Sequence, residues 1–402
     1  MSNSEIIDRL SEHILTDGFH ITVDPILSEG SWIVDVEGNR YLDCYSQFAS
    51  QTLGWKHSAL IKAQNEMGSA GRVKMANSDM YSREYADFVD KFSEITPDFK
   101  YYFFIDGGAL GVENALKAAF DWKAKKLKYT HTVDINNLDI FHLKNAFHGR
   151  TGYTLSLTNT TPEKTALFPK FRWTTVEPNW ENIENRMHEE VAAIIVEPIQ
   201  GEGGDNHFSP EFFKNLRRIA NERDCLLIFD EVQTGMGLTG KMWAYEHFGI
   251  IPDMMCFGKK TQVCGFCATE RIDEVEDNVF QTSGRINSTW GGNIVDMVRF
   301  CYIVDSIKKD KLVDNAGKVG GHLLSELSKI EHLSNARGRG LMIAFDLKNE
   351  KERDLMASKL SENMLILKCG KNSIRLRPPL TFSVDDANTA LKYIKEAAIS
   401  IQ

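Results

Sequence analysis

The amino-acid sequence predicts an α/β protein with a mostly parallel central sheet in a large domain, and a smaller α+β domain formed by both chain ends. Two observations predict the sheet. Short apolar runs such as 226–229 and 254–257 have the character of buried strands, and segments with helical periodicity separate these runs along the chain. The chain of 402 residues is too long for one compact core, so we expect two or three domains.

The composition narrows the classes of function. A hydrophobic content of 42% and a net charge of −9 are ordinary for a globular protein and give no reason to expect nucleic acid or a membrane as partner. Every apolar run is shorter than the roughly 18 residues of a membrane span, and the N-terminus carries no export signal. The scattered cysteines predict reduced thiols in a cytoplasmic protein, and the pair Cys264 and Cys267 has no second pair at zinc spacing, so no metal is expected.

The domain organisation follows from the change of pattern along the chain. We predict that residues 1–55 and 296–402 together form the small domain and that residues 56–295 form the large one. A β-hairpin is expected around the turn at 37–39, and further strands are expected over 340–347 and near 373–380. Because the hairpin is too small to bury a core alone, it should pack on the C-terminal segment.

The large domain alternates strands and helices. A helical region is expected over 58–92, with a glycine-rich interruption. An apolar strand over 101–106 then leads into a Gly-Gly turn, and a helix is expected to begin near Gly108 or Ala109. Free backbone N–H groups and the helix dipole make such a start a binding site for an anion. A plain tight turn is the alternative interpretation.

Two further strands lead into polar loops. The strand at 139–144 is followed by Phe147, which could stack on a planar ring or belong to the core, and by Arg150, which could bind a carboxylate. We interpret His148, between them, as structural. The strand at 192–198 leads into a loop in which Glu202 lies between glycines that allow close approach to a ligand. The next helix, 209–224, has serine and proline at its start.

An acid and an amine follow the last two strands of this series. Asp230 comes directly after the run 226–229, and Lys259 and Lys260 follow the run 254–257. Carboxyl ends of parallel strands meet at one sheet edge, where ligands of such sheets bind. An amine there can form an imine with a carbonyl cofactor, and an acid can hold a protonated pyridine nitrogen, as pyridoxal phosphate requires. Two ordinary loops with charges facing water are the alternative.

These motifs, and the order in which they follow one another along the chain, resemble those of the class III aminotransferases. These are fold-type-I transferases that depend on pyridoxal phosphate. The similar strings are DEVQ at 230–233, the stretch from Asp253 to Gly258-Lys259, FHGR at 147–150, EPIQGEGG at 197–204 and RLRPPL at 375–380. The resemblance covers nearly the whole chain. Further strings, including FGKKTQVCG and RINSTWGGN, are similar to family members that act on the terminal amine of L-lysine. The connection at 158–190 is short beside that family.

The resemblance implies roles around the cofactor. Lys259 would form the imine with the cofactor and then carry the proton, and Asp230 would pair with the pyridinium nitrogen. Gln233 would reach the ring hydroxyl or nearby substrate, and Phe147 would stack on the ring.

The phosphate would be bound across two subunits. The resemblance implies that Gly108 and Ala109 offer backbone N–H groups and that Thr289 comes from a neighbouring chain. We therefore expect a homodimer with shared active sites.

For the substrates, the resemblance implies that Arg150 binds the far carboxylate of each, with Asn287 assisting. Arg375 would bind the α-carboxylate of L-glutamate or 2-oxoglutarate, and Glu202 would neutralise Arg375 while L-lysine is bound. Arg377 would share a strand face with Arg375, so periodicity cannot choose between the two arginines.

The expected activity is transfer of the ε-amino group of L-lysine to 2-oxoglutarate in two half-reactions, which gives L-glutamate and 2-aminoadipate 6-semialdehyde. One alternative keeps the chemistry and changes the donor to ornithine or 4-aminobutyrate. A racemase on the same scaffold is a second alternative, but it has no need of Arg375 and Glu202 together. A binding protein without activity is the third, and it has no need of Lys259 beside Asp230.

Overall fold

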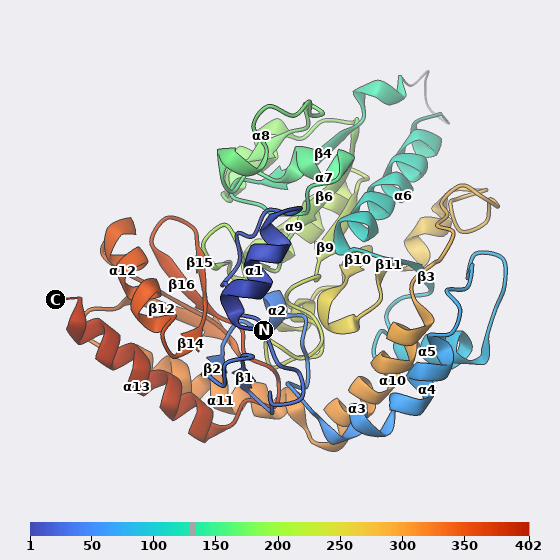
Figure 1. The fold of residues 1–402 in the computed structure, drawn as a ribbon. Helices are drawn as coiled ribbons and strands as arrows, with labels where there is room; N and C mark the ends of the chain where they lie inside the picture. Colours follow the sequence, from blue (N-terminus) through green and yellow to red (C-terminus); the bar gives the residue numbers. More distant parts are fainter. Residues whose placement is uncertain (129–133, 402) are drawn as a thin grey trace.

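The computed structural model describes residues 1–128 and 134–401, and it is built around a seven-stranded sheet with the order β3-β11-β10-β9-β6-β4-β5 (Figure 1). Its strands are β3 (Tyr101–Ile105), β4 (Asp139–Leu143), β5 (Thr175–Val176), β6 (Val191–Val196), β9 (Leu226–Asp230), β10 (Met254–Phe257) and β11 (Cys264–Ala268). Neighbours from β10 to β5 pair in parallel, and β11 runs antiparallel to both β10 and β3. The predicted mostly parallel sheet is confirmed.

Strand β11 is absent from the prediction made on the sequence. Its five residues, Cys264–Ala268, include a glycine and two cysteines, and all five are buried. Gly265 interrupts the run, so β11 lacks the continuous series of large apolar residues that identified the equally buried strands β9 and β10.

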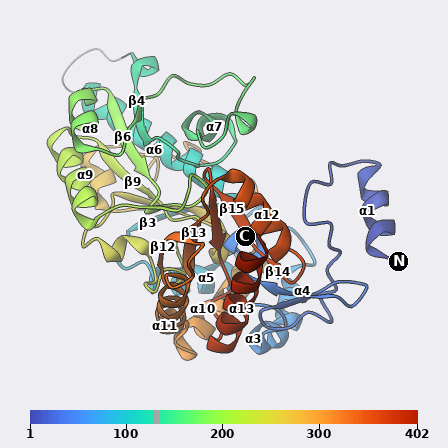
Figure 2. The ribbon, with the colours of Figure 1, turned by 90° about the vertical axis from the view of Figure 1, so that its left-hand side faces the viewer.

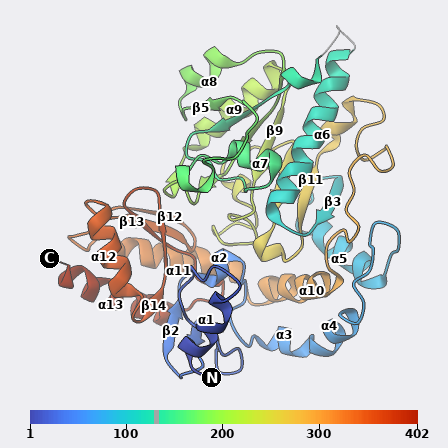
Figure 3. The ribbon, with the colours of Figure 1, turned by 45° about the horizontal axis from the view of Figure 1, so that its top comes forward.

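Helices cover both faces of the sheet. Helix α6 (Gly108–Lys128) packs on the face that carries Ile228, whereas α9 (Pro210–Glu222), α5 (Arg83–Ser93) and α10 (Ile294–Lys309) belong to the core on the face of Phe229. Successive side chains of a strand point to opposite faces, which is why neighbours in β9 join different clusters. Figure 3 shows α10 beside α3 (Ser58–Lys62) and α4 (Gln64–Ala70), which it contacts. The remaining short helices of this part are α7 (Gly152–Leu157) and α8 (Trp180–Arg186).

Two predicted helix starts are confirmed. Helix α6 begins at Gly108, directly after β3 and its turn. Helix α9 begins at Pro210, and the Ser209 hydroxyl accepts a hydrogen bond from the Phe212 N–H. A capping hydroxyl followed by proline is favoured here because the first N–H groups of a helix have no partner within it.

The two chain ends meet in a small sheet. Strands β1 (Trp32–Val34) and β2 (Arg40–Asp43) form the predicted hairpin, and β14 (Met364–Leu365) pairs in parallel with β2. A four-stranded sheet adjoins it, with the order β12 (Ser334–Arg339), β13 (Met342–Asp346), β16 (Ser373–Leu376) and β15 (Leu367–Cys369). Helices α11 (Leu312–Leu327), α12 (Glu350–Leu360) and α13 (Val384–Ser400) accompany these strands (Figure 1). The domain boundaries near residues 55 and 295 stay predictions.

Helix α1 (Asn3–Ser11) stands apart from the body of the molecule at the side of the view in Figure 2, and it buries none of its residues. Within residues 1–128 and 134–401, every helix is too short or too polar to cross a membrane.

Candidate active site

A cavity of about 660 Å³ opens where β4, β6, β9 and β10 end. It brings together all of the predicted site residues except Asn287 and Thr289. Those lining it are Gly108, Ala109, Phe147, Arg150, Glu202, Asp230, Gln233, Lys259 and Arg375. Residues from several loops converge here because the carboxyl ends of parallel strands share one edge.

The tandem lysines after β10 lie in different surroundings. Lys259 opens the short 3₁₀ turn Lys259–Thr261 with φ of 54°, and its side chain faces the cavity. Burial, together with the nearby Arg375 guanidinium, lowers the pKa of Lys259 to about 8. The Lys260 side chain instead is buried and donates a hydrogen bond to the Ala49 carbonyl oxygen. Near neutral pH, part of Lys259 is therefore an uncharged, nucleophilic amine.

Asp230, the last residue of β9, is buried and held from two sides. Its Oδ2 lies 2.8 Å from His148 Nδ1, and its Oδ1 accepts a hydrogen bond of 3.1 Å from the Val232 N–H. Because a carboxylate only accepts hydrogen bonds, His148 Nδ1 carries the proton in this contact. His148, which the sequence suggested only as structural, contacts the acid of the site directly. The FHGR string includes His148, but nothing in that string indicates its contact with Asp230, which lies 82 residues further along the chain.

Glu197 is a residue of the site that sequence reasoning missed. It follows β6, lines the cavity and accepts hydrogen bonds from the backbone N–H groups of Phe147 (2.9 Å) and Gly201 (3.1 Å). Burial raises the pKa of Glu197 to about 7. Its carboxyl group therefore links the loop of Phe147 to the loop of Glu202.

The structure distinguishes between Arg375 and Arg377, which the periodicity of the strand could not. Arg377, just beyond β16, forms a buried ion pair with Asp205 and donates to the carbonyl oxygens of Ile343 and Leu376. Arg375, within β16, lines the cavity. Among the residues that the structure describes, none accepts a hydrogen bond from its buried Nε or Nη1. Of Arg375 and Arg377, Arg375 is thus the one with hydrogen bonds left to donate to a ligand.

The loop around Glu202 runs between the short strands β7 (Ile199–Gln200) and β8 (Asn206–His207). A Cβ atom at Gly201 would clash with the Gln233 amide oxygen, and one at Gly203 would clash with the Asn145 carbonyl oxygen. These glycines therefore allow close approach to neighbouring protein, where the sequence suggested approach to a ligand. Glu202 itself forms an ion pair with Lys164 and accepts a hydrogen bond of 3.1 Å from Thr160 Oγ1.

The mouth of the cavity includes residues from the N-terminal segment. Asp17 and Phe48 line it together with the exposed Arg150. Phe48 lies in the turn α2 (Ser46–Ala49), whose φ angles between 43° and 66° are left-handed and cost about 1–2 kcal/mol per residue. Ser46 Oγ donates a hydrogen bond of 2.5 Å to the Arg377 carbonyl oxygen, which anchors this turn to the far end of the chain. No local sequence pattern predicts such a contact.

Asn287 and Thr289 lie outside the cavity of their own chain. Both are exposed, and the Thr289 carbonyl oxygen accepts a hydrogen bond of 3.2 Å from Ser78 Oγ. The exposed apolar side chains of Val73, Met80, Tyr81 and Trp290 belong to the same two segments, 73–81 and 287–290.

The residues of the cavity suit pyridoxal phosphate. An amine at 259 and an acid at 230 share the space with the aromatic ring of Phe147. The first residues of α6, Gly108 and Ala109, line it as well, and the leading N–H groups of a helix can bind a phosphate.

Comparisons with known proteins show the family of the chain. A family model described as aminotransferase class-III matches residues 18–398. The chain is 42% identical to an L-lysine-epsilon aminotransferase of Amycolatopsis lactamdurans, over 98% of this chain and 96% of that protein. It is 32% identical to the mitochondrial 4-aminobutyrate aminotransferase of Homo sapiens, over 92% and 83% of the two chains. The structure superimposes on a lysine aminotransferase from M. tuberculosis in the internal aldimine form with a TM-score of 0.95, at 41% identity and with complete coverage of both chains.

Proposed function

Because the chain belongs to the class III aminotransferase family, we propose that it transfers the ε-amino group of L-lysine to 2-oxoglutarate, with pyridoxal phosphate as cofactor. The products are 2-aminoadipate 6-semialdehyde and L-glutamate. One observation carries the proposal: a single cavity holds the amine of Lys259, the acid of Asp230 and an Arg375 whose buried Nε and Nη1 find no acceptor among the described residues. The similarity to relatives that act on lysine supports this donor over ornithine and 4-aminobutyrate.

When bound, the cofactor supplies an electron sink for the carbon that carries the transferred nitrogen. Lys259 would hold the cofactor through its amine, and its Nζ would afterwards carry a proton from the substrate carbon. Asp230 keeps the ring nitrogen protonated, and His148 orients Asp230. Phe147 would stack on the ring, and Gln233 would contact the ring hydroxyl or nearby substrate.

The substrates differ in where their charges lie relative to the reacting amine. In L-glutamate a carboxylate is attached to the carbon that bears the amine, and Arg375 binds it. In L-lysine the reacting ε-amine has no carboxylate nearby, so Arg375 needs an internal partner. Glu202 lines the same cavity and serves as that partner during the lysine half-reaction. Arg150, at the mouth, binds the distal carboxylate of each substrate.

Replacing Glu202 by alanine should separate the two half-reactions. The lysine half-reaction should slow by about ten- to hundredfold, because a charged group without its hydrogen-bond partner costs roughly 1.5–3 kcal/mol. The glutamate half-reaction should keep its rate. Single-turnover absorbance changes with each donor measure both, and Glu163→Ala, at an exposed neighbouring glutamate, is the control. Equal slowing of both half-reactions would remove Glu202 from this role.

Asp17 is the carboxylate of the cavity best placed for the α-ammonium group of lysine. The other carboxylates that line the cavity have partners: Glu197 with backbone N–H groups, Glu202 with Lys164, and Asp230 with His148. In the described part of the chain no hydrogen bond or ion pair engages Asp17, which remains available to a ligand.

We expect Asp17→Asn to raise the KM for lysine by up to about fivefold, the range of a partly exposed ion pair. The KM for 6-aminohexanoate, which lacks the α-ammonium group, should stay the same, as should that for glutamate. Steady-state kinetics with the three donors test this. A common rise in all three KM values would indicate a structural role for Asp17.

We propose further that the active enzyme is a cytoplasmic homodimer. The segments with Val73, Met80, Tyr81 and Trp290 expose large apolar side chains beside Asn287 and Thr289. Burial of such side chains is the usual driving force of association. In the dimer each chain would supply Thr289 to the cofactor phosphate, and Asn287 to the substrate carboxylate, in the cavity of its partner. Sedimentation of the holoenzyme at several concentrations tests this, and a monomer at every concentration would reject the homodimer.

The proposed reaction is tested by a screen of amine donors. The purified protein, loaded with pyridoxal phosphate, is incubated with 2-oxoglutarate and either L-lysine, ornithine or 4-aminobutyrate, and the L-glutamate formed is measured. L-lysine should give the highest kcat/KM. Efficient turnover of another donor with none of lysine would reject the proposed substrate.

A further inference from the structure

Glu202 lines the same cavity as two cations, Lys164 and Arg375. In the structure its carboxylate is bound by Lys164 and Thr160. The residue before it already lies against Arg375, since a Cβ atom at Gly201 would be 3.4 Å from Arg375 Nη1. No described residue takes up the hydrogen bonds that Arg375 Nε and Nη1 can donate. The Glu202 carboxylate therefore contacts one cation, Lys164, and shares the cavity with a second, Arg375, that has hydrogen bonds left to donate.

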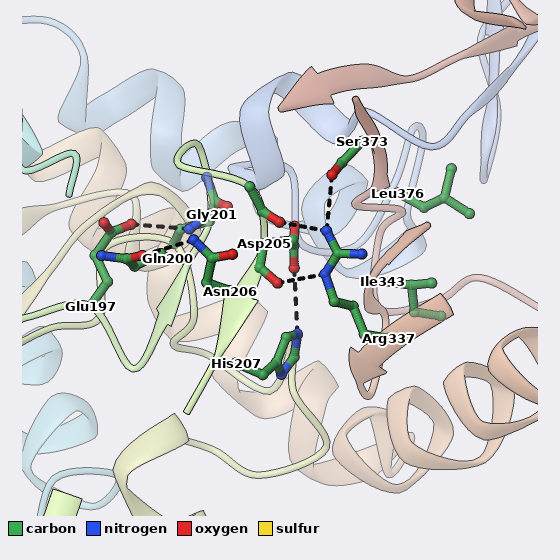
Figure 4. A network of polar contacts seen from close by, with 12 residues as sticks. Glu197, Gln200, Gly201, Asp205, Asn206, His207, Arg337, Ile343, Ser373 and Leu376 are labelled. Carbon is green, nitrogen blue, oxygen red and sulfur yellow. Dashed lines mark hydrogen bonds and ion pairs between the residues drawn. The ribbon is translucent and has the colours of Figure 1, made fainter. Parts of the chain in front are cut away.

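The backbone that carries Glu202 is fixed at both ends. Figure 4 shows that Arg337, from β12, donates to the Asp205 carbonyl oxygen at 2.9 Å and to Ser373 Oγ at 2.9 Å. At the other end the Glu197 carboxylate accepts from the Gly201 N–H (Figure 4). With the loop anchored in this way, an exchange of partners is a rotation of the Glu202 side chain rather than a movement of the loop.

We propose that Lys164 is a positioning residue that, together with Thr160, holds Glu202 away from Arg375 while a dicarboxylate substrate occupies the cavity. This inference rests on the proposed function. The arrangement in the structure leaves Arg375 open to a carboxylate, as L-glutamate and 2-oxoglutarate require. The competition between Lys164 and Arg375 for Glu202 then sets how well the enzyme binds dicarboxylates relative to lysine.

The ion pair between Lys164 and Glu202 has the strength needed for Glu202 to exchange between Lys164 and Arg375. The Lys164 side chain is 35% exposed and that of Glu202 is 20% exposed, so the pair is partly solvated. A pair of this kind is weak enough to break during turnover and strong enough to change a binding constant severalfold. A fully buried pair would lock Glu202 in one position.

Lys164→Met tests the proposal, because it removes the charge and keeps the aliphatic stem. The readout is the Kd of the holoenzyme for glutarate, a dicarboxylate that cannot react, measured by isothermal titration calorimetry. We expect the Kd to rise about two- to fivefold, since Glu202 then competes for Arg375. Lys164→Arg should restore the wild-type value. Lys170→Met removes an exposed lysine of the same segment outside the cavity and should have no effect.

A double-mutant cycle with Glu202→Gln identifies the partner through which Lys164 acts. In that background Lys164→Met should leave the Kd for glutarate unchanged. If glutarate binding weakens equally in both backgrounds, Lys164 contacts the dicarboxylate itself and the proposal is overturned. An unchanged Kd in Lys164→Met alone also overturns it. Failure of the proposed function is distinguishable, because it would appear in the wild-type protein as absence of glutamate formation from lysine.

Discussion

Replacing Lys259 by alanine is expected to lower turnover by at least about 10⁴-fold, because the variant loses the group that carries the proton as well as the nucleophile. Lys259 faces the cavity and has its pKa lowered to about 8, whereas the neighbouring Lys260 is buried and engaged by the Ala49 carbonyl oxygen. Single-turnover absorbance changes with lysine and with glutamate measure the loss. Both half-reactions should fail, since each needs the same amine.

Two controls accompany the Lys259 variant. Lys241→Ala, at an exposed lysine outside the cavity, should retain full activity. In the wild-type holoenzyme, borohydride reduction followed by peptide mapping should place the pyridoxyl group on Lys259. A label on Lys260, or a Lys259→Ala variant with more than about a hundredth of the wild-type rate, would contradict the assignment.

Asp230→Asn should lower kcat by about 10²- to 10⁴-fold. Loss of one partner from a buried charge pair costs roughly 3–5 kcal/mol, and every 1.4 kcal/mol is tenfold in rate. An amide cannot keep the ring nitrogen protonated, and its interaction with His148 Nδ1, now 2.8 Å from a carboxylate oxygen, would weaken as well. Steady-state kinetics of the folded variant, with thermal unfolding as a check on its integrity, measure the effect.

Asp139→Asn is the matched control. Asp139 is as buried as Asp230 and also faces a histidine, with His188 Nε2 at 3.1 Å from Oδ2, but it lies at the start of β4, away from the cavity. Its substitution should affect the free energy of unfolding more than kcat.

Partial rescue of Asp230→Asn by a cofactor analogue methylated on the ring nitrogen would support the role of Asp230 in keeping that nitrogen charged, because the methylated ring carries its charge permanently. An Asp230→Asn variant with near-full activity would reject it.

Many of the strands and helix starts could be predicted from local patterns in the sequence. The strands β3, β4, β6, β9 and β10 and the starts of α6 and α9 all follow from apolar runs, glycine turns and capping residues. Strand β11 did not follow, because Gly265 and two cysteines take the place of the large apolar residues that mark the other buried strands. A buried strand is recognised by a continuous apolar run, and a glycine within so short a run removes that signal.

Some residues of the candidate site could likewise be predicted from the sequence, whereas others could not. The residues that end strands, such as Asp230 and Lys259, were predicted as neighbours because parallel strands bring their carboxyl ends to one edge. Glu197, Asp17 and Lys164 were not recognised as lining residues. Glu197 directly follows β6, so its place at the end of a strand was a signal that could have identified it. Asp17 and Lys164 reach the cavity through loops whose course no spacing in the chain encodes.

The sequence by itself therefore determined the class of fold, the family and the set of polar groups at one sheet edge, since these depend on local strand, turn and helix signals. Only the tertiary structure decided that His148 contacts Asp230 and that Glu202 forms an ion pair with Lys164. It also decided that Arg377 forms an ion pair with Asp205, whereas Nε and Nη1 of Arg375 have no acceptor among the described residues. These partners are distant in the chain. The energy of a charge depends on burial and on separations of a few ångströms, which arise only when distant segments pack together.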